Sequence, residues 1–591
     1  MGANHRVGVA RSVVRPAFKM GLALACWCIV YPSVGGGQLA PHDSLRVLHE
    51  GQRAQAAFEM FRRVRFPHVQ DGGEKVCDIQ VGRFCYWHRE DESAVPEPRE
   101  ITTTREKFLR TLGRLHARSP EDPWIIGQWV RYLIEGGDDS SAIAVSRKCS
   151  STVWWCDALK GFALHAAQRY EQAEVVFDSA LAIMPEQERC RWTDISLLLP
   201  GDERTQYEKL PCGDRGGFER HFWQLADPSY AIPGNDRRTE HFTRVVLAKL
   251  SETSQNAYGL PWGDDMRELL IRYGAPISYA TSWPVWPSTT GHIIGYEREP
   301  SFHFAAVTEG GDDVHWDVHA AAAPERYAPA YIDTLTKLAA QFAMFRRGDS
   351  ALVVVVYDDA RPHRKANTAD KTVPGSMGDA VLGVLDTTMM TNQRDSIYHD
   401  VHDSTTDIHV RMARVEWRGV VAALEQYDPR TKRAGWTRVW LAPPAPLGGT
   451  PQLSTLLLFR GTDTSTAGSL DDALRTALTA DVIDKRQTLG VYWEMYAGPD
   501  TAMPLASTDV SLIVTRTNGG VLRWLAHALY LFPKDAPLKV RWHDTPVLGG
   551  VSYRSVMLDL TQVPSGTYRI TLAVGTDDQH RTTTTREIRV R

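Results

Sequence analysis

The spacing of apolar residues changes once along this chain of 591 residues, and the change constrains the fold more than any single motif. Before about residue 350, apolar side chains recur every three or four positions, as on one face of an α-helix. After Ser350 they mostly alternate with polar side chains, as in half-buried β-strands. The chain is also long enough for several domains. We therefore predict a multidomain α+β protein with helices first and β-sandwich units last.

The N-terminal part carries small and aromatic residues at a repeating spacing. We expect helices over residues 43–66 and 104–117. Farther on, the residues Gly161, Ala173, Phe177, Ala180 and Pro185 resemble a tetratricopeptide repeat, and Gly127 lies one repeat length earlier. The small residues would let two helices approach, Phe177 would fill their seam and Pro185 would end the second helix.

Residues 43–215 are thus expected to form a helical, tetratricopeptide-like region. Such arrays usually bind other proteins on a concave face, so we expect protein partners there. The alternative is a helical hairpin that only packs against the next domain.

Residues 261–276 contain the start and stop signals of one further helix. Asp264 or Asp265 is a suitable N-cap, and Glu268 follows Asp265 at the spacing of a capping box. Trp262 precedes the cap and is expected to pack over the helix start, while Tyr273 belongs to the buried stripe. Gly274 and Pro276 provide the stop. We interpret these residues as a structural motif rather than as a reactive site.

The same run resembles the GWxTD domain, a family of exported bacterial proteins without an established activity. The signature reads Pro261-Trp262-Gly263-Asp264-Asp265, in which Trp262 and Asp265 match while Pro261 and Asp264 replace the family's glycine and threonine. The resemblance covers about residues 216–349 and implies a central α/β domain. It implies no catalytic residues.

The rest of the chain is expected to be mainly β. A hairpin is expected over residues 301–319 and an amphipathic helix over residues 331–347, both within the central domain. Segments in which apolar and polar residues alternate then follow and are expected to be strands. Residues 408–426 are expected to form one long strand. These strands predict one β-sandwich-like domain at 350–462 and another at 485–591.

The first 36 residues have the pattern of a secretory signal peptide. Basic residues precede a 12-residue apolar run at 20–31, and small residues follow it. The run is too short for an ordinary membrane span, which takes about 20 residues. A lipid anchor at Cys26 is disfavoured, because Leu24 stands at the wrong position and few apolar residues precede the cysteine. We therefore expect export to the periplasm or the medium, with no transmembrane span in the mature chain.

Six cysteines remain after this leader, and all of them lie before residue 215. Sequence proximity favours three local disulfides, Cys77–Cys85, Cys149–Cys156 and Cys190–Cys212. Six cysteines allow about 15 pairings, so proximity alone supports this choice. Free buried thiols are the alternative, which an oxidising compartment disfavours.

Groups with ligand spacing are few. The residues His315, Asp317 and His319 would share one strand face, His399, His402 and His409 lie in a polar stretch, and Glu494 stands among aromatic residues as in a sugar-binding strand. Exposed polar faces explain the histidines better than a metal does, so we expect no metal and no cofactor. The net charge of −4 argues against nucleic acid as a partner.

These observations favour an extracytoplasmic protein-binding or envelope-assembly protein. Among the common enzyme signatures, neither a nucleophile elbow, nor a metalloprotease helix, nor a phosphate loop is present in the sequence. Two alternatives remain: a hydrolase of envelope polymers and a carbohydrate-binding protein.

Overall fold

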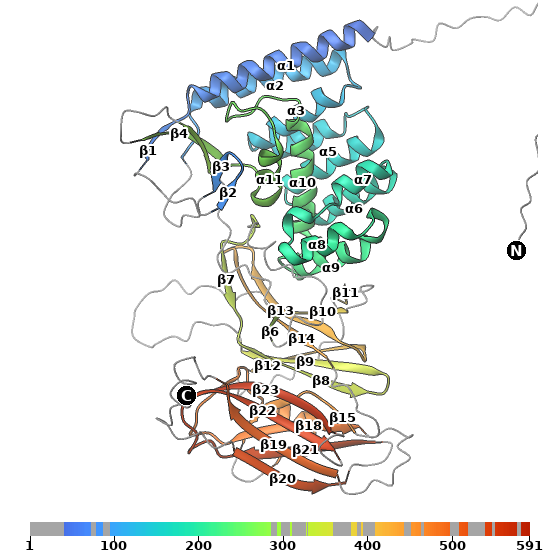
Figure 1. The fold of residues 1–591 in the computed structure, drawn as a ribbon, viewed down its shortest axis with the longest axis vertical. Helices are drawn as coiled ribbons and strands as arrows, with labels where there is room; N and C mark the ends of the chain where they lie inside the picture. Colours follow the sequence, from blue (N-terminus) through green and yellow to red (C-terminus); the bar gives the residue numbers. More distant parts are fainter. Residues whose placement is uncertain are drawn as a thin grey trace, which may run out of the picture.

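The chain is a mixed α+β protein in which a helical part lies at one end of a stack of β-sheets (Figure 1). The computed structural model describes residues 41–71, 79–86, 95–284, 292–296, 308–309, 327, 329–358, 380–386, 392–393, 408–442, 451–461, 466–496, 508–517, 538–545, 550–575 and 581–591.

The helical part contains most of the helices. They are α1 (Pro41–Arg63), α2 (Arg99–Arg118), α3 (Pro123–Glu135), α4 (Asp139–Ser146), α5 (Val153–Ala166), α6 (Tyr170–Ile183), α7 (Glu186–Trp192), α8 (Gly201–Lys209), α9 (Gly216–Ala226), α10 (Asp236–Ser251) and α11 (Asp264–Tyr273), with short 3₁₀ turns η1 (Ser196–Leu198) and η2 (Cys212–Asp214). The helices expected at 43–66 and 104–117 are thereby confirmed as α1 and α2. Within the described ranges no helix is both long and apolar enough to cross a bilayer.

The α5–α6 hairpin follows the spacing read from the sequence. Gly161 of α5 faces the Phe177 ring of α6, and a Cβ atom on Gly161 would stand 2.9 Å from that ring. The side chains of Ala173, Phe177 and Ala180 are completely buried. Pro185 directly precedes α7, where it occupies the N-cap position. Small residues therefore permit the close contact between these two helices.

Helix α10 packs against α3, α5 and α6. At Gly127 of α3 a Cβ atom would lie 2.4 Å from the Cδ2 atom of Leu250 in α10, so the missing side chain makes room for Leu250. Gln128 fixes the same contact by donating to the Leu250 carbonyl oxygen at 3.0 Å. One face of these paired helices is therefore covered by α10 of the same chain.

Four sheets form the β stack. The sheet next to the helices has the order β11-β10-β13-β14-β6, with β7 also on β14, and it is followed by β12-β9-β8. Their strands are β6 (Thr308–Glu309), β7 (Thr334–Lys337), β8 (Ala340–Arg347), β9 (Ser350–Asp358), β10 (Val381–Asp386), β11 (Asn392–Gln393), β12 (Ile408–Glu416), β13 (Val420–Asp428) and β14 (Arg433–Leu441).

The other two sheets of the stack are β15-β18-β16, with β21 on β18, and β17-β23-β22-β19-β20. Their elements are β15 (Gln452–Leu453), β16 (Leu457–Arg460), the helix α12 (Leu470–Arg475), β17 (Val482–Ile483), β18 (Leu489–Tyr496), β19 (Thr508–Arg516), β20 (Leu538–Asp544), β21 (Val551–Leu558), β22 (Gly566–Gly575) and β23 (Arg581–Val590). The strands expected after residue 485 lie within β18 to β23.

Two small sheets accompany the helices. Strand β1 (His68–Asp71) pairs in parallel with β4 (Ser278–Pro284), which pairs with β5 (His292–Tyr296), while β2 (Ile79–Val81) and β3 (Phe84–Tyr86) form a hairpin. The hairpin expected at 301–319 lies outside the described residues, except for Thr308 and Glu309 in β6.

Successive apolar clusters lie between the layers, from the helices through the stack. Val421 and Ala423 of β13 belong to the core of the helical part. The opposite face of that sheet packs on β8 and β9, and the other face of β9 packs on β16, β18 and α12. Consequently Val353 to Val356 of β9 are completely buried, which explains their unbroken apolar run.

The helix expected at 331–347 is wrong, because this segment forms β7 and β8. Residues 341–345 of β8 are all buried, since both faces of the strand are covered. A strand buried on both faces shows no alternation, so the helical spacing of Leu338, Phe342 and Phe345 was a coincidence. The expected strand at 408–426 is likewise two strands, β12 and β13.

The pairing of strands also crosses two predicted domain boundaries. A division between residues 349 and 350 would cut the β8–β9 hairpin, whose strands pair along their full length. A division at 462 would assign β15 and β16 to the first sandwich, although both pair with β18 of the next one. Neither boundary coincides with a gap in the packing.

Candidate functional site

The predicted helix start at residues 261–265 exists, but its capping is not as predicted. The N-cap of α11 is Gly263, which makes no side-chain cap. The Asp265 carboxylate accepts from the Met266 N–H at 2.8 Å and from Arg83 in the β2–β3 turn, at 2.6 Å from Nε, 2.8 Å from Nη2 and 3.1 Å from the backbone N–H. Arg83 also donates to the Pro261 carbonyl oxygen at 2.9 Å. These donors hold the pKa of the Asp265 carboxyl well below its usual range.

The remaining residues of the motif differ in their surroundings. Glu268 pairs with Arg272 at 2.6 Å, so the predicted capping box is wrong. Asp264 is exposed and Trp262 is only partly buried, outside every apolar cluster of the described chain. Tyr273 packs with Leu269 against Val81 of the hairpin.

The end of α11 is fixed as the sequence predicts, with one unforeseen partner. Gly274 has a φ of 99°, which favours glycine, and its N–H donates to the Leu270 carbonyl oxygen at 2.9 Å. Arg244 of α10 donates to the carbonyl oxygens of Ile271 and Arg272 at 3.0 Å and 2.8 Å. Pro276 lies close to Gly295 of β5. The motif therefore connects α11 to the β2–β3 hairpin, α10 and β5.

A second polar cluster joins the helical part to the β stack. Arg438 of β14 pairs with Glu425 of β13 at 2.8 Å, and both side chains are buried. Arg438 also donates to the Asp227 carbonyl oxygen at 2.8 Å and lies 3.8 Å from the centre of the Tyr230 ring. The other oxygen of Glu425 accepts from the Ser229 hydroxyl at 2.9 Å and from the Ala231 N–H at 3.0 Å. The segment between α9 and α10 is thereby fastened to the sheet.

Two carboxyl groups near this junction have raised pKa values. Burial raises the pKa of Asp236 to about 6, although the hydroxyls of Tyr327 and Tyr331 oppose the shift. Tyr331 donates to Asp236 at 3.0 Å. Burial also raises the pKa of Asp227 well above its usual value, and the nearby charge of Asp236 adds to this effect.

A cavity of about 580 Å³ opens beside the junction. It lies between α6, α9, the segment that follows α9, and the start of α10, and its lining includes Glu174, Asp178, Glu219, Trp223, Asp227 and Arg238. Glu174 and Asp178 both pair with Arg238. Glu219 accepts from the Tyr207 hydroxyl at 2.8 Å, and burial raises the pKa of this carboxyl.

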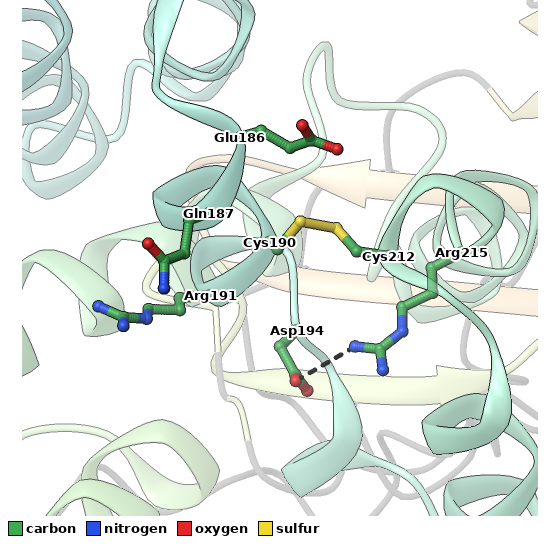
Figure 2. A pocket seen from close by; sticks show the side chains of 7 residues that line it. All are labelled: Glu186, Gln187, Cys190, Arg191, Asp194, Cys212 and Arg215. Carbon is green, nitrogen blue, oxygen red and sulfur yellow. Dashed lines mark hydrogen bonds and ion pairs between the residues drawn. A yellow bond between two sulfur atoms is a disulfide. The ribbon is translucent and has the colours of Figure 1, made fainter. Parts of the chain in front are cut away.

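A second, more open depression of about 550 Å³ adjoins the Cys190–Cys212 disulfide. Figure 2 shows the disulfide between α7 and η2, with Asp194 and Arg215 paired below it at 3.4 Å. The disulfide Cys149–Cys156 is also present, so the structure contains two of the three pairings that proximity favours. Cys77 lies outside the described residues, so the pairing with Cys85 is not among those that the structure describes.

Most residues weighed as metal ligands fall outside the described ranges, namely His315, Asp317, His319, His399 and His402. His409 is in β12, where its ring stacks on Tyr357. Over the part of the chain that the structure describes, no three histidine, cysteine or acidic side chains gather as metal ligands would.

Glu494 does not lie on an exposed aromatic face. Its carboxylate is completely buried, pairs with Arg347 at 2.6 Å and accepts from the hydroxyls of Tyr492 and Tyr496. The expected resemblance to a sugar-binding strand is therefore wrong, because the aromatic side chains face inward.

Sequence reasoning missed the Arg83–Asp265 pair, the Arg438–Glu425 pair and the cavity. The two partners in the first pair are separated by 182 residues, which no local pattern reveals. Glu425 and Arg438 do leave a signal, because Glu425 directly follows the apolar residues 420–424 of β13 and Arg438 directly precedes the apolar residues 439–441 of β14. In comparisons with known proteins, the sequence matches no family model and no curated protein.

Proposed function

We propose that this chain is an exported binding or assembly protein, and that its helical part is held in a fixed position on a β stack to present a surface to a partner. The support for export is the leader pattern at residues 1–36 together with two disulfides in the helical part. The resemblance of residues 261–276 to the GWxTD signature agrees with this compartment, and we propose that the chain is a divergent relative of that family.

The observation that carries the proposal is the use of the charged side chains. Arg83–Asp265 and Arg347–Glu494 each join elements that are distant in sequence, and the Arg438–Glu425 pair binds the segment after α9 to the sheet. The hydrogen bonds of these side chains hold neighbouring structural elements together. The same groups are therefore not positioned to act as nucleophiles or general bases. A fixed arrangement of layers lowers the entropic cost of binding, which suits a scaffold.

A hydrolase remains the second candidate, because Glu219 and Asp227 line one cavity and burial raises the pKa of both carboxyls. A protonated acid beside a second carboxyl is the pair that many glycoside hydrolases use. Glu219 and Asp227 are the residues to substitute if hydrolysis of an envelope polymer is found.

Site-specific crosslinking in the native cells tests the binding function. A photoreactive amino acid replaces Arg220, which is exposed at the cavity, and in a control chain it replaces Arg414, which is exposed on β12. We expect a discrete crosslinked protein from position 220 and none from position 414. Equal products from both positions, or none from either, would contradict the proposal.

N-terminal sequencing of the chain from the same cells tests export. The protein should begin near residue 37, without the leader. A cytoplasmic form that still begins at Met1 would rule out the proposed compartment.

A further inference from the structure

The cavity between α6, α9 and α10 contains a buried carboxylate that the fold does not fully use. Asp227 is 6% exposed and lines the cavity. Its Oδ1 accepts from the Ser229 N–H at 3.1 Å. Its Oδ2 accepts no hydrogen bond from the residues that the structure describes, although the nearby Arg438 has five donors. Arg438 gives its donors to Glu425 and to the carbonyl oxygens of Asp227 and Pro228.

The other acidic side chains of the lining already have hydrogen-bond or ion-pair partners in the cavity wall. Four carboxylates and two guanidinium groups line it. Arg238 is neutralised by Glu174 and Asp178, and Glu219 is hydrogen-bonded to Tyr207. Arg220 is exposed at the rim. Asp227 is therefore the buried acceptor that remains for a ligand.

The wall around Asp227 is held in place without a ligand. Gly234 has a φ of 86°, and a Cβ atom there would stand 2.3 Å from the backbone nitrogen of Glu171. Asn235 donates to the Trp223 carbonyl oxygen at 2.6 Å and also accepts from the Arg238 N–H at 2.8 Å. Because this segment is anchored at both helices, the cavity is preorganised.

From this geometry we propose that the cavity binds a basic side chain, lysine or arginine, of a partner polypeptide, with Asp227 as its counter-ion. The proposal deepens the proposed function and rests on it, since it names the chemistry of the partner. An ammonium or guanidinium group supplies the donor that Oδ2 lacks and a charge opposite to the acidic excess of the lining. It also offsets the burial that raises the pKa of Asp227.

Titration with blocked tripeptides tests this site. The probes are acetyl-Gly-Lys-Gly-amide, acetyl-Gly-Arg-Gly-amide and acetyl-Gly-Glu-Gly-amide, added to the full mature protein and followed by NMR or calorimetry. We expect at least one basic peptide to bind and the acidic peptide not to bind. Asp227→Asn, which keeps the shape of the side chain, should weaken that binding by about tenfold or more. Asp202→Asn on the exposed face of α8 is the matched control and should bind as the wild type does.

Three results would overturn the inference: no binding of either basic peptide, equal binding of the acidic peptide, or undiminished binding by folded Asp227→Asn. If Asp227→Asn does not fold, the comparison of basic and acidic peptides on the wild-type protein decides. Butylamine, which has the amine of lysine without a peptide, is a further probe. If butylamine bound as tightly as the basic peptides, the site would be assigned to a small amine instead. The crosslink from position 220 is measured separately. The hypothesis of a cation site and the hypothesis of a binding function can therefore be rejected independently of each other.

Discussion

Asp265 stands in the first turn of α11, where its carboxylate could cap the backbone N–H groups of its own helix. It accepts from one of them, the Met266 N–H at 2.8 Å, and receives three more hydrogen bonds from Arg83, of which two come from the guanidinium group. A charged donor in bidentate geometry makes a stronger hydrogen bond than a neutral backbone group does. At the scale of residues, a charged partner brought near by folding adds to the local backbone donor.

Substituting Asp265 by asparagine should loosen the β2–β3 hairpin more than the protein as a whole. The amide protons of residues 81–84 should exchange about tenfold faster, because local opening loses its ionic contact. The neighbouring substitution Asp264→Asn is the control, since Asp264 is exposed. Hydrogen exchange measured by mass spectrometry or NMR would contradict this interpretation if the two variants behaved alike.

Asp236 gives the stability a pH dependence of known sign. Its pKa is about 6 in the folded protein and lower in the unfolded chain, so the folded state binds more protons between about pH 4 and pH 6. Stability from this group is therefore greatest at low pH and is lost as the pH rises through this window, by about 3 kcal/mol at most.

The comparison with Asp236→Asn isolates that contribution. Asparagine can still accept from Tyr331 but does not titrate. The free energy of unfolding of the wild type, relative to the variant, should fall between pH 4 and pH 7 in urea titrations. A difference that stays constant or rises over this range would refute the assignment.

At the scale of elements, helix pairs are defined by small residues at their crossing points. Gly161 faces Phe177 between α5 and α6, and Gly127 faces Leu250 between α3 and α10. The first contact joins two helices that follow each other in the sequence, and the spacing of Gly161 and Phe177 predicted it. The second joins helices more than a hundred residues apart, so no local spacing reveals it.

Replacing Gly161 by alanine should destabilise the α5–α6 pair. The new methyl group would lie 2.9 Å from a completely buried ring, and such overpacking costs about 1–3 kcal/mol. Gly217→Ala in α9 is the control, because no atom lies within 4 Å of its Cβ position. Chemical denaturation should show a loss for position 161 and no loss for position 217, whereas equal stability of the two variants would mean that the α5–α6 contact tolerates the added volume.

At the scale of the whole molecule, the helical part and the adjoining sheet share one apolar cluster. Val421 and Ala423 of β13 belong to the helical cluster, and Arg438 and Glu425 add buried polar contacts at the same junction. We therefore expect the two parts to unfold together rather than as independent domains.

Arg438→Met should break this coupling. The substitution leaves the Glu425 carboxylate buried without its cation, which typically costs about 3–5 kcal/mol. The thermal transition followed by helical circular dichroism should then separate from that of the sheets. Arg414→Met, an exposed site on β12, should keep a single transition. Separate transitions already present in the wild-type protein would contradict a common core.

The sequence by itself determined the mixed class of the chain, the existence of α1, α2 and the α5–α6 hairpin, the strands after residue 350 and the end of α11 at Gly274. These features follow from the spacing of apolar residues and from glycine at special positions, which act within a few residues. Prediction from local spacing was wrong at residues 331–347. Both faces of β8 are buried, so its apolar and polar residues do not alternate as they do in a half-exposed strand.

Only the tertiary structure decided that Arg83 binds Asp265, that α10 occupies a face of the helical pairs, that Glu494 faces inward and that Asp227 lines a cavity. Each depends on elements that are far apart in the chain, so no residue spacing encodes it. The physical reason is that charge pairing and burial are properties of three-dimensional neighbours, whereas a sequence pattern reports only the residues nearby along the chain.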